Sequence, residues 1–369
     1  MGEAKPQTAS PEPAGLGVVV VTYDAADVIV GCLESLMAAR GTGPEAGDLR
    51  VVVVDNASTD DTVQVIRDWA AGRAPFAPPE GGLPFAMAPV AYPVPLTEGG
   101  PDLVPAADAG ITLIHSGANR GFAGGVNLGL AALARDPAIG HFWVLNPDCM
   151  VPAASLAAVR ARLAEIPEYG LLGGRVIYLE SGVIQMDAGL MNRWTGVTGN
   201  FNFGGPLSSP PPQASDMVFI SGASMVASRT FYDTAGPMKE DYFLYYEEVD
   251  WALRRGALPL VYCPGFDIYH LGGSSIGSAA VGRLRAAPFS LYFKHRSRIR
   301  FQRRFHPWAL PVAWAFSLAQ AARTALLRRS PAGAWAILTG SFGLPVPRAV
   351  RARLNPDACA HAFQPRQKS

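Results

Sequence analysis

The sequence predicts an α/β fold in which a mostly parallel sheet carries helices on both faces. Two short runs, Leu16–Thr22 and Arg50–Val54, are dominated by β-branched residues, as is typical of strands that are covered on both sides. Between them, apolar residues recur at helical spacing from Val28 to Ala39. A chain of 369 residues with 49% hydrophobic and 17% charged residues can bury one large core or two modest ones, which excludes disordered and fibrous classes.

The alternation of strand and helix continues through the first half of the chain. Helical spacing returns at Thr62–Ala70 and in the Ala- and Leu-rich segment Gly124–Arg135. The runs Ile111–His115 and His141–Leu145 have the composition of strands. Because successive βαβ units place their strands parallel and side by side, residues 16–150 are predicted to form one sheet.

The second half of the chain is predicted to be more mixed. Leu171–Leu179, Met217–Val226 and Leu258–Cys263 have the composition of strands, and a helix is expected to start near Glu247. Residues 308–342 are apolar and helical. Polar and charged residues interrupt that segment before a run of about 18 apolar residues accumulates, so it is not predicted to span a bilayer.

Residues 72–110 are rich in Pro and Gly and interrupt the alternation of strands and helices at a point where a short loop is expected. A structureless segment of this length is uncommon inside a compact domain, so we predict a surface insertion, with a functional lid as the alternative. Because the segment lies between two strands of the predicted sheet, it could reach the carboxyl edge, where open α/β sheets bind ligands.

Charge and cysteine content limit the partners and the compartment. The chain has 31 Lys and Arg against 30 Asp and Glu, so there is no global attraction for nucleic acid and no nucleic-acid partner is expected. The four cysteines are far apart and form no CxxC pair, which favours a reducing compartment. Residues 1–15 are polar and lack the apolar run of a secretory signal, so they are predicted to be a disordered tail of a cytoplasmic protein.

A basic segment precedes the apolar helices at the end of the chain. Residues 294–304 carry six Lys and Arg residues together with His295. Beside amphipathic helices this segment could dock on anionic lipid, which gives peripheral membrane contact through residues 294–342 as one interpretation. The other is a solvated basic helix face with core helices behind it. Residues 291–369 are thus predicted to be a basic, amphipathic helical region, and whether the chain forms a homo-oligomer stays open.

Polar residues follow two of the predicted strands of the first half. Asp55 comes directly after the second strand, where a carboxylate can accept the N3–H of uracil or thymine, although a helix-capping turn explains it equally well. Residues 119–127 form a Gly-rich turn that opens a helix and can expose N–H groups to a phosphate, with Arg120 adding charge. A purely structural turn remains the alternative. The segment matches neither the G-x-G-x-x-G dinucleotide pattern nor a P-loop.

Asn146 and Asp148 follow the strand that ends at Leu145. A carboxylate beside a carboxamide can hold Mg²⁺ or Mn²⁺, with substrate phosphates completing the coordination shell, but an Asn-Pro-Asp turn is also a common loop sequence. His270 follows another strand-like run, and a lone histidine is more often structural than a ligand. Asn146, Asp148 and His270 therefore indicate a metal site only when they are considered together with the other motifs.

Residues 241–255 combine an aromatic cluster with Glu247, Glu248 and Asp250 at the start of a helix that ends in two arginines. Acidic residues at the first turn and basic residues at the last suit the helix dipole, which is the structural interpretation. Three carboxylates in an apolar setting are also expected to push one pKa upward, toward the range of a general base.

Seven motifs, in this order, resemble those of family 2 glycosyltransferases, particularly the bacterial rhamnosyltransferase-like branch. They lie between about Gly17 and Gln302 and are V-V-V-T-Y-D, V-V-D-N-A-S-T-D, N-R-G-F-A-G-G-V-N, L-N-P-D, Ser221-Gly222-Ala223, F-L-Y-Y-E-E-V-D-W and Tyr269-His270. The resemblance implies a GT-A fold, in which residues 16–150 bind the nucleotide sugar and residues 151–290 bind the acceptor and supply catalysis. It further implies inverting transfer from a nucleotide-diphosphate donor, dTDP-rhamnose or a UDP-sugar, to a hydroxyl of a glycan or lipid-linked acceptor in polysaccharide or cell-envelope synthesis.

The resemblance also assigns the donor side of the site. Asp148 resembles the last Asp of the family's D-x-D motif and His270 a further metal ligand, so Mg²⁺ or Mn²⁺ is the implied cofactor. Asn146 stands where the first Asp is expected, which puts metal dependence in question. The implied nucleotide-sugar contacts are Thr22, Tyr23, Asp24, Asp55, Asn119, Arg120, Gly121, Asn127 and Asn146.

On the acceptor side, Glu248 stands at the Asp of the family's Glu-Asp pair, the usual catalytic base. Its extra methylene leaves Glu247 and Asp250 as alternatives. Residues 189–212 are implied to form the acceptor-side loop, where tryptophans could offer flat faces to a sugar ring. The implied acceptor contacts are Trp194, Ser221, Gly222 and Trp251.

Two other classes of protein compete with a transferase. Because Asn146 and Glu248 both depart from the family pattern, a nucleotide-sugar-binding protein of the same fold with impaired catalysis is the alternative. A nicotinamide-dependent oxidoreductase is disfavoured, since the chain has no G-x-G-x-x-G pattern.

Overall fold

The computed structural model describes residues 15–41, 48–105, 110–272 and 287–363. The predicted N-terminal tail lies, apart from its last residue, outside the described residues. The strands are β1 (Gly15–Thr22), β2 (Leu49–Asp55), β3 (Leu96–Gly99), β4 (Ile111–His115), β5 (Ile139–Leu145), β6 (Cys149–Met150), β7 (Leu171–Tyr178), β8 (Ile184–Met186), β9 (Gly189–Met191), β10 (Thr198–Asn200), β11 (Ser224–Ser228) and β12 (Leu260–His270). The helices are α1 (Ile29–Arg40), α2 (Thr62–Ala70), α3 (Gly121–Ala134), α4 (Ala153–Glu165), α5 (Arg229–Ala235), α6 (Glu247–Leu253), α7 (Pro288–Phe305), α8 (Leu310–Leu326), α9 (Pro331–Phe342), α10 (Arg348–Arg351) and α11 (Pro356–Ala362), with 3₁₀ turns at Ala214–Asp216, Glu240–Tyr242 and Pro307–Ala309.

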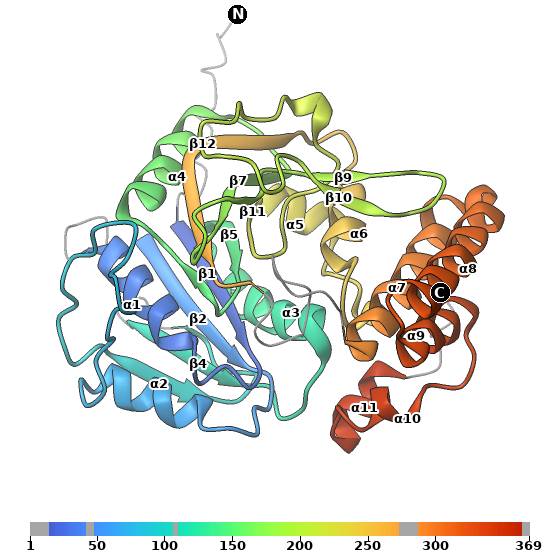
Figure 1. Ribbon diagram of the computed structural model, residues 1–369. Helices are drawn as coiled ribbons and strands as arrows, with labels where there is room; N and C mark the ends of the chain where they lie inside the picture. Colours follow the sequence, from blue (N-terminus) through green and yellow to red (C-terminus); the bar gives the residue numbers. More distant parts are fainter. Residues whose placement is uncertain (1–14, 42–47, 106–109, 273–286, 364–369) are drawn as a thin grey trace, which may run out of the picture.

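Ten of the strands form one twisted sheet, visible through the centre of Figure 1, in the order β3-β4-β2-β1-β5-β11-β7-β12-β6, with β8 added beside β7. The strands from β3 to β5 are all parallel. β11 runs antiparallel to both of its neighbours, whereas β12 is again parallel to β7. The predicted fold class, α/β with a mostly parallel sheet and a more mixed second half, is therefore confirmed.

The valine runs of β1 and β2 are explained by a core on each side of the sheet. Val18 and Val20 belong to the cluster beneath α1, α2 and α4, while Val19 and Val21 belong to the cluster beneath α3. Successive side chains of a strand point to opposite faces, so both faces of these strands must be apolar. Gly129 of α3 lets the helix approach β1, because a Cβ there would lie 2.4 Å from Val19.

Two predicted segments differ from the structure. The strand expected at Met217–Val226 begins only at Ser224, because Ser221 and Gly222 form a turn before it. The Pro- and Gly-rich segment is not structureless: it contributes β3, the edge strand of the sheet. Its Phe85 ring stacks 5.2 Å from that of Tyr269, so the segment reaches the end of β12.

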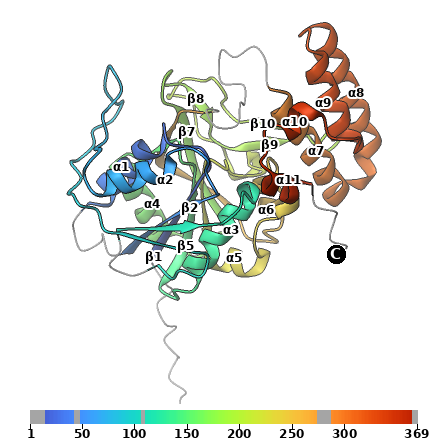
Figure 2. The same ribbon diagram turned by 90° about the horizontal axis from the view of Figure 1, so that it is seen from below.

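The C-terminal helices form a layer of their own beside the sheet. Figure 1 shows α7, α8 and α9 packed together at one side with α10 and α11 below them, and Figure 2 shows α11 near α3. α7 is the inner helix, and its Phe301 is fully buried in the cluster that contains α6. Within the described residues, no helix combines the length and the apolar character needed to cross a membrane.

Candidate active site

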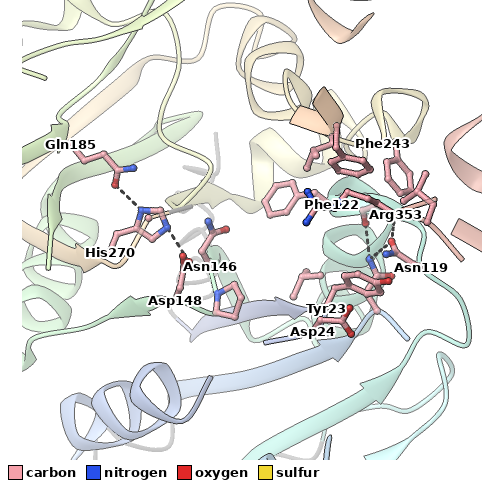
Figure 3. Close-up of a pocket in the computed structure, with 18 of the residues that line it drawn as sticks. Tyr23, Asp24, Asn119, Phe122, Asn146, Asp148, Gln185, Phe243, His270 and Arg353 are labelled. Atoms are coloured by element: carbon pink, nitrogen blue, oxygen red, sulfur yellow. Dashed lines mark hydrogen bonds and ion pairs between the residues drawn. The ribbon is translucent and has the colours of Figure 1, made fainter. Parts of the chain in front are cut away.

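A cavity of about 610 Å³ opens at the carboxyl edge of the sheet, where parallel α/β sheets bind their ligands. Figure 3 shows its two ends. One end holds Asn146, Asp148 and His270, and the other holds Tyr23 and Asp24 with their neighbours. The sequence-predicted residues that line this cavity are Tyr23, Asp24, Asn119, Gly121, Asn146, Asp148 and His270.

The Tyr23 end is built by three loops that hydrogen-bond to one another. Asp24, in a left-handed backbone conformation, accepts hydrogen bonds from the backbone N–H and the hydroxyl of Thr59 at 2.7 and 3.2 Å. Asn56 joins the loop after β2 to the Gly-rich turn, because its amide donates to Gly121 O at 3.0 Å and accepts from the N–H of Arg120 at 3.1 Å. These hydrogen bonds link the three loops directly to one another.

The glycine of that turn has a steric role. Gly121 has a φ of 75°, and a Cβ there would lie 2.4 Å from Phe243 O. Only glycine allows this approach, which brings the segment before α6 against the Gly-rich turn. Phe243 thereby becomes part of the cavity wall.

The opposite end is a buried pair of an acid and a histidine. Strand register sets it, because His270 of β12 lies beside Cys149 of β6. His270 Nε2 lies 2.9 Å from Asp148 Oδ1, and its Nδ1 lies 2.6 Å from Gln185 Oε1. Burial acts to raise the pKa of Asp148, but the charge and hydrogen bond of His270, with backbone N–H groups, outweigh it and lower the pKa below its usual value. Asp148 is therefore a carboxylate at neutral pH.

Asp148, Cys149 and His270 are a group whose ligand atoms all lie within 4.8 Å of one another. A carboxylate and an imidazole are suitable ligands for a divalent cation. The thiol differs, since burial raises the pKa of Cys149 well above its usual range and its Sγ–H donates to Ala223 O at 3.4 Å. Asp148 and His270 are thus the residues here that could hold Mg²⁺ or Mn²⁺.

The three carboxylates at the start of α6 have three different surroundings. Glu248 is partly buried beside the Ser221-Gly222 turn, where a Cβ on Gly222 would lie 3.6 Å from its Cγ. Burial raises the pKa of Glu248 to about 7, although backbone N–H groups and the charge of Lys294 pull it down. A carboxyl group with this pKa can accept a proton near neutral pH.

Glu247 and Asp250 are both buried. Burial, and then the charge of Glu248, raise the pKa of Glu247 well above its usual range. Asp250 accepts hydrogen bonds from Arg254 at 2.7 Å, Arg304 at 2.6 Å and the Tyr242 hydroxyl at 2.9 Å. Both carboxylate oxygens of Asp250 therefore already accept hydrogen bonds from protein groups, which indicates a structural role.

Four of the predicted donor contacts do not line the cavity. Thr22 is buried and donates to Asp55 Oδ1 at 3.4 Å, while Asp55 also accepts from a backbone N–H of the following loop. Asn127 holds α3 to the segment before α6 through Met238, accepting from its N–H and donating to its carbonyl, both at 2.9 Å. Arg120 is likewise absent from the cavity wall among the described residues.

The two predicted tryptophans have opposite locations. Trp251 is fully buried, donates to Gly236 O at 2.8 Å and packs edge-on against Phe231, so the structure places it in the core and not against an acceptor. Trp194, on the hairpin of β9 and β10, is 57% exposed and lies edge-on to Trp308 with ring centroids 4.6 Å apart. Helix α7 fixes this hairpin through Gln302, which donates to Trp194 O at 3.2 Å.

Sequence reasoning missed the part of the wall that comes from outside the motifs. Gln185 lies on β8, and the segment after α10 brings Arg353 to the Tyr23 end of the cavity (Figure 3). No local pattern marks either residue. The polar or aromatic lining residues outside the motifs are Tyr178, Gln185, Phe289 and Arg353. Three further lining residues, Asn56, Phe122 and Phe243, lie within the motifs but were given no role.

Comparisons with known proteins show which sequences this chain is similar to. The family model described as "Glycosyl transferase family 2" matches residues 17–78, which contain β1, β2 and the loops that follow them. An N-acetylglucosaminyl-diphospho-decaprenol L-rhamnosyltransferase of Mycobacterium tuberculosis is 26% identical over 256 residues, which is 63% of this chain and 81% of the relative.

Two solved structures are similar to this chain over most of its length. The mannosyltransferase PcManGT from Pyrobaculum calidifontis, in complex with GDP-Man and Mn²⁺, has a TM-score of 0.47 and 17% identity, covering 92% of this chain and 90% of its own. TarS residues 1–349 of S. aureus, in complex with UDP-GlcNAc, has a TM-score of 0.46 and 14% identity, covering 92% and 84%.

The protein is a glycosyltransferase. Its residues 17–78 match glycosyltransferase family 2, which is the family that the sequence motifs resemble.

Proposed function

We propose that this enzyme transfers a sugar with inversion from a nucleotide-diphosphate donor, dTDP-rhamnose or a UDP-sugar, to a hydroxyl of a glycan or lipid-linked acceptor. One observation carries the proposal: a single cavity joins the Asp148–His270 pair to the Tyr23 and Asp24 loops at the carboxyl edge of the sheet. The first group suits a diphosphate with its cation, and the second suits the nucleoside. In this proposal residues 16–150 bind the donor and residues 151–290 bind the acceptor.

A divalent cation, Mg²⁺ or Mn²⁺, fits the donor set of Asp148 and His270. The amide of Gln185 can accept the proton of His270 Nδ1, so that Nε2, once it gives up its hydrogen bond to Asp148, would offer a lone pair to the cation. When bound, the cation would neutralise the charge that develops on the diphosphate leaving group. Asn146, at the position of the missing Asp, lines the same end of the cavity with an uncharged oxygen.

Glu248 is the proposed catalytic base. Its carboxylate takes the proton of the acceptor hydroxyl while that oxygen forms a bond to the anomeric carbon of the donor. The bond between this carbon and the diphosphate oxygen breaks, and a nucleoside diphosphate leaves with the electron pair. Attack from the face opposite the leaving group inverts the anomeric centre. The pKa of about 7 allows Glu248 to accept a proton at neutral pH and to release it to water afterwards.

The acceptor is proposed to approach past the β9–β10 hairpin. Trp194 is exposed there, and the Ser221-Gly222 turn lies against Glu248. The Mycobacterium tuberculosis relative is, by its name, a rhamnosyltransferase acting on N-acetylglucosaminyl-diphospho-decaprenol. A lipid-linked acceptor of this kind would come from a membrane surface, and cell-envelope synthesis on the inner face of the membrane is the role that we propose.

An exposed apolar surface supports such an approach. On α8 the outward side chains recur every three or four residues, and the surface continues to Trp308 and to α9. Residues 268–356 contain 14 Lys and Arg and no Asp or Glu. We define the apolar stripe by its most exposed large side chains, which are Trp308, Val312, Leu318, Leu326, Leu327 and Trp335. An apolar face with surrounding positive charge is suited to an anionic bilayer surface.

Thermal unfolding with a panel of donors tests the proposed function. We expect UDP- or dTDP-linked sugars to raise the Tm only with Mn²⁺ or Mg²⁺ present, because a ligand at a hundred times its Kd adds about 2.7 kcal/mol of stability. The Asp148→Ala variant should lose the effect of the metal and at least about 100-fold in turnover. Donor hydrolysis without transfer to any acceptor would favour the impaired binding protein. No shift with any nucleotide sugar would contradict both.

A further inference from the structure

The C-terminal arm, defined as residues 348–363, closes one wall of the donor cavity. It contains α10 and α11, and the turn between them contributes Ala352, Arg353 and Leu354 to the lining. More than half of the chain separates this turn from the loops after β1 and β4, yet Figure 3 shows Arg353 beside Asn119 and Phe122. The arm lies outside residues 17–78, which match the family model.

The arm is anchored firmly enough to hold a side chain in place. Arg296 of α7 is buried and donates to Ala362 O and to Tyr242 O, each at 2.7 Å. Its guanidinium lies 4.4 Å from the ring centroid of Phe293, and the Phe363 ring stacks on Phe293 with centroids 6.0 Å apart. One arginine therefore ties the arm to the segment that leads into α6.

Arg353 is the one Lys or Arg among the described residues that line the cavity. Its guanidinium lies 5.6 Å from the Phe289 ring centroid, and no described acceptor forms a hydrogen bond or ion pair with it. The side chain is exposed toward the cavity and solvent. The other charged side chains of the described lining are the carboxylates of Asp24 and Asp148, at opposite ends of the cavity, and they repel an anionic donor.

We propose that Arg353 binds the nucleoside diphosphate part of the donor and that the C-terminal arm is a structural part of the donor site. The inference rests on the proposed function, since it names a further residue of the same site. A guanidinium held against an aromatic ring keeps its N–H fork free for phosphate oxygens, and such charge-assisted contacts are among the stronger hydrogen bonds. Arg353 takes the place of the cation that Arg120 was expected to supply.

Isothermal titration with UDP, dTDP and GDP, in the presence of Mn²⁺, tests this assignment. We expect Arg353→Met to raise the Kd of the bound nucleotide by about tenfold or more, because it keeps the stem beside Phe289 and removes the charge. The Kd of Arg353→Lys should lie between that of the unmodified protein and that of Arg353→Met. Arg348→Met is the matched control, since Arg348 lies on the same arm but not in the cavity wall, and it should stay within about twofold of the unmodified protein.

Three outcomes would overturn the proposal. An unchanged Kd in Arg353→Met, with the same Tm as the unmodified protein, removes the role of the side chain while leaving the proposed function intact. An equal loss in Arg348→Met would indicate a general effect of charge and would also remove it. If the unmodified protein binds none of the three nucleotides, the proposed function fails and the inference fails with it.

Discussion

At the scale of single residues, the neighbouring glutamates Glu247 and Glu248 differ in burial and in contacts. Glu248 is partly buried against Gly222, whereas Glu247 is buried and its Oε1 has no hydrogen-bond partner among the described residues. We expect Glu248→Gln to lower kcat by at least about 100-fold, since general-base catalysis contributes roughly that much or more. Glu247→Gln should keep most of the activity, because Gln is nearly isosteric with Glu and places no charge in this buried position. Steady-state turnover of both variants is the measurement.

The pH profile distinguishes this role from a structural one. A base acts only when deprotonated, so kcat should rise as the pH rises through about 7, the pKa of Glu248. This rise of kcat with pH should be absent from the residual activity of Glu248→Gln. If Glu248→Gln is as active as the unmodified enzyme, with the same rise of kcat with pH, the base must be another group.

The sequence alone could not separate these acids. It predicts correctly that the carboxylates open a helix beside aromatic residues. The distinction between Glu248 and Asp250 depends on Arg304, which lies 54 residues further on and pairs with Asp250. A helix-dipole argument gives all three acids the same environment, because only the packing of α7 on α6 makes them different.

At the scale of elements, Asp250 joins α6 to α7. It is fully buried and pairs with Arg254 of its own helix end and with Arg304 of α7. We expect Asp250→Asn to lower the free energy of unfolding by about 2 kcal/mol or more, because it leaves two arginines without their buried counter-charge. Urea denaturation checks this value. Asp68→Asn is the control, since the Asp68–Arg73 pair is exposed to solvent and should contribute much less to stability.

A result in which both variants unfold at the same urea concentration would contradict this account of Asp250. It would mean that the contact of α7 with α6 depends on apolar packing alone, through residues such as Phe301.

Elements with strong periodicity were predictable, and those defined by long-range contacts were not. The valine runs of β1 and β2 and the helix at Thr62–Ala70 have the bounds that the sequence predicts to within a residue. The edge strand β3 could not be predicted, since Leu96–Gly99 has little strand character and becomes one only by pairing with β4. The same holds for Gln185, whose role depends on the strand register that brings β8 and β12 to opposite sides of β7.

At the scale of the whole molecule, basic and acidic residues are separated along the chain. The 14 basic residues of 268–356 are almost half of the 31 in the protein, and no acidic residue accompanies them, so the remainder is acidic. The basic part includes α7 to α10, and Figure 1 places these helices together on one side. The protein therefore has an asymmetric charge distribution, with one positively charged side, although its net charge is only +1.

The apolar stripe lies on this positively charged side. Leu326 and Leu327 are 76% and 75% exposed and are followed directly by two exposed arginines. Trp308 joins the stripe to Trp194 of the β9–β10 hairpin, on the proposed path of the acceptor. We therefore expect the enzyme to bind its membrane with α8 along the surface, where it can receive an acceptor whose lipid stays in the bilayer.

Co-flotation with vesicles tests this orientation. The protein should float with vesicles that contain an anionic lipid, float less at high salt, and stay behind with purely zwitterionic vesicles, because the charge is screened or absent in those cases. Leu326→Asp with Leu327→Asp should reduce binding by at least about tenfold, since two desolvated charges replace two apolar side chains. Val104→Asp, which alters an exposed apolar residue near β3, should have no effect. If the unmodified protein is a dimer that ignores both kinds of vesicle, and the double variant is a monomer, the stripe is instead covered by a second copy of the chain.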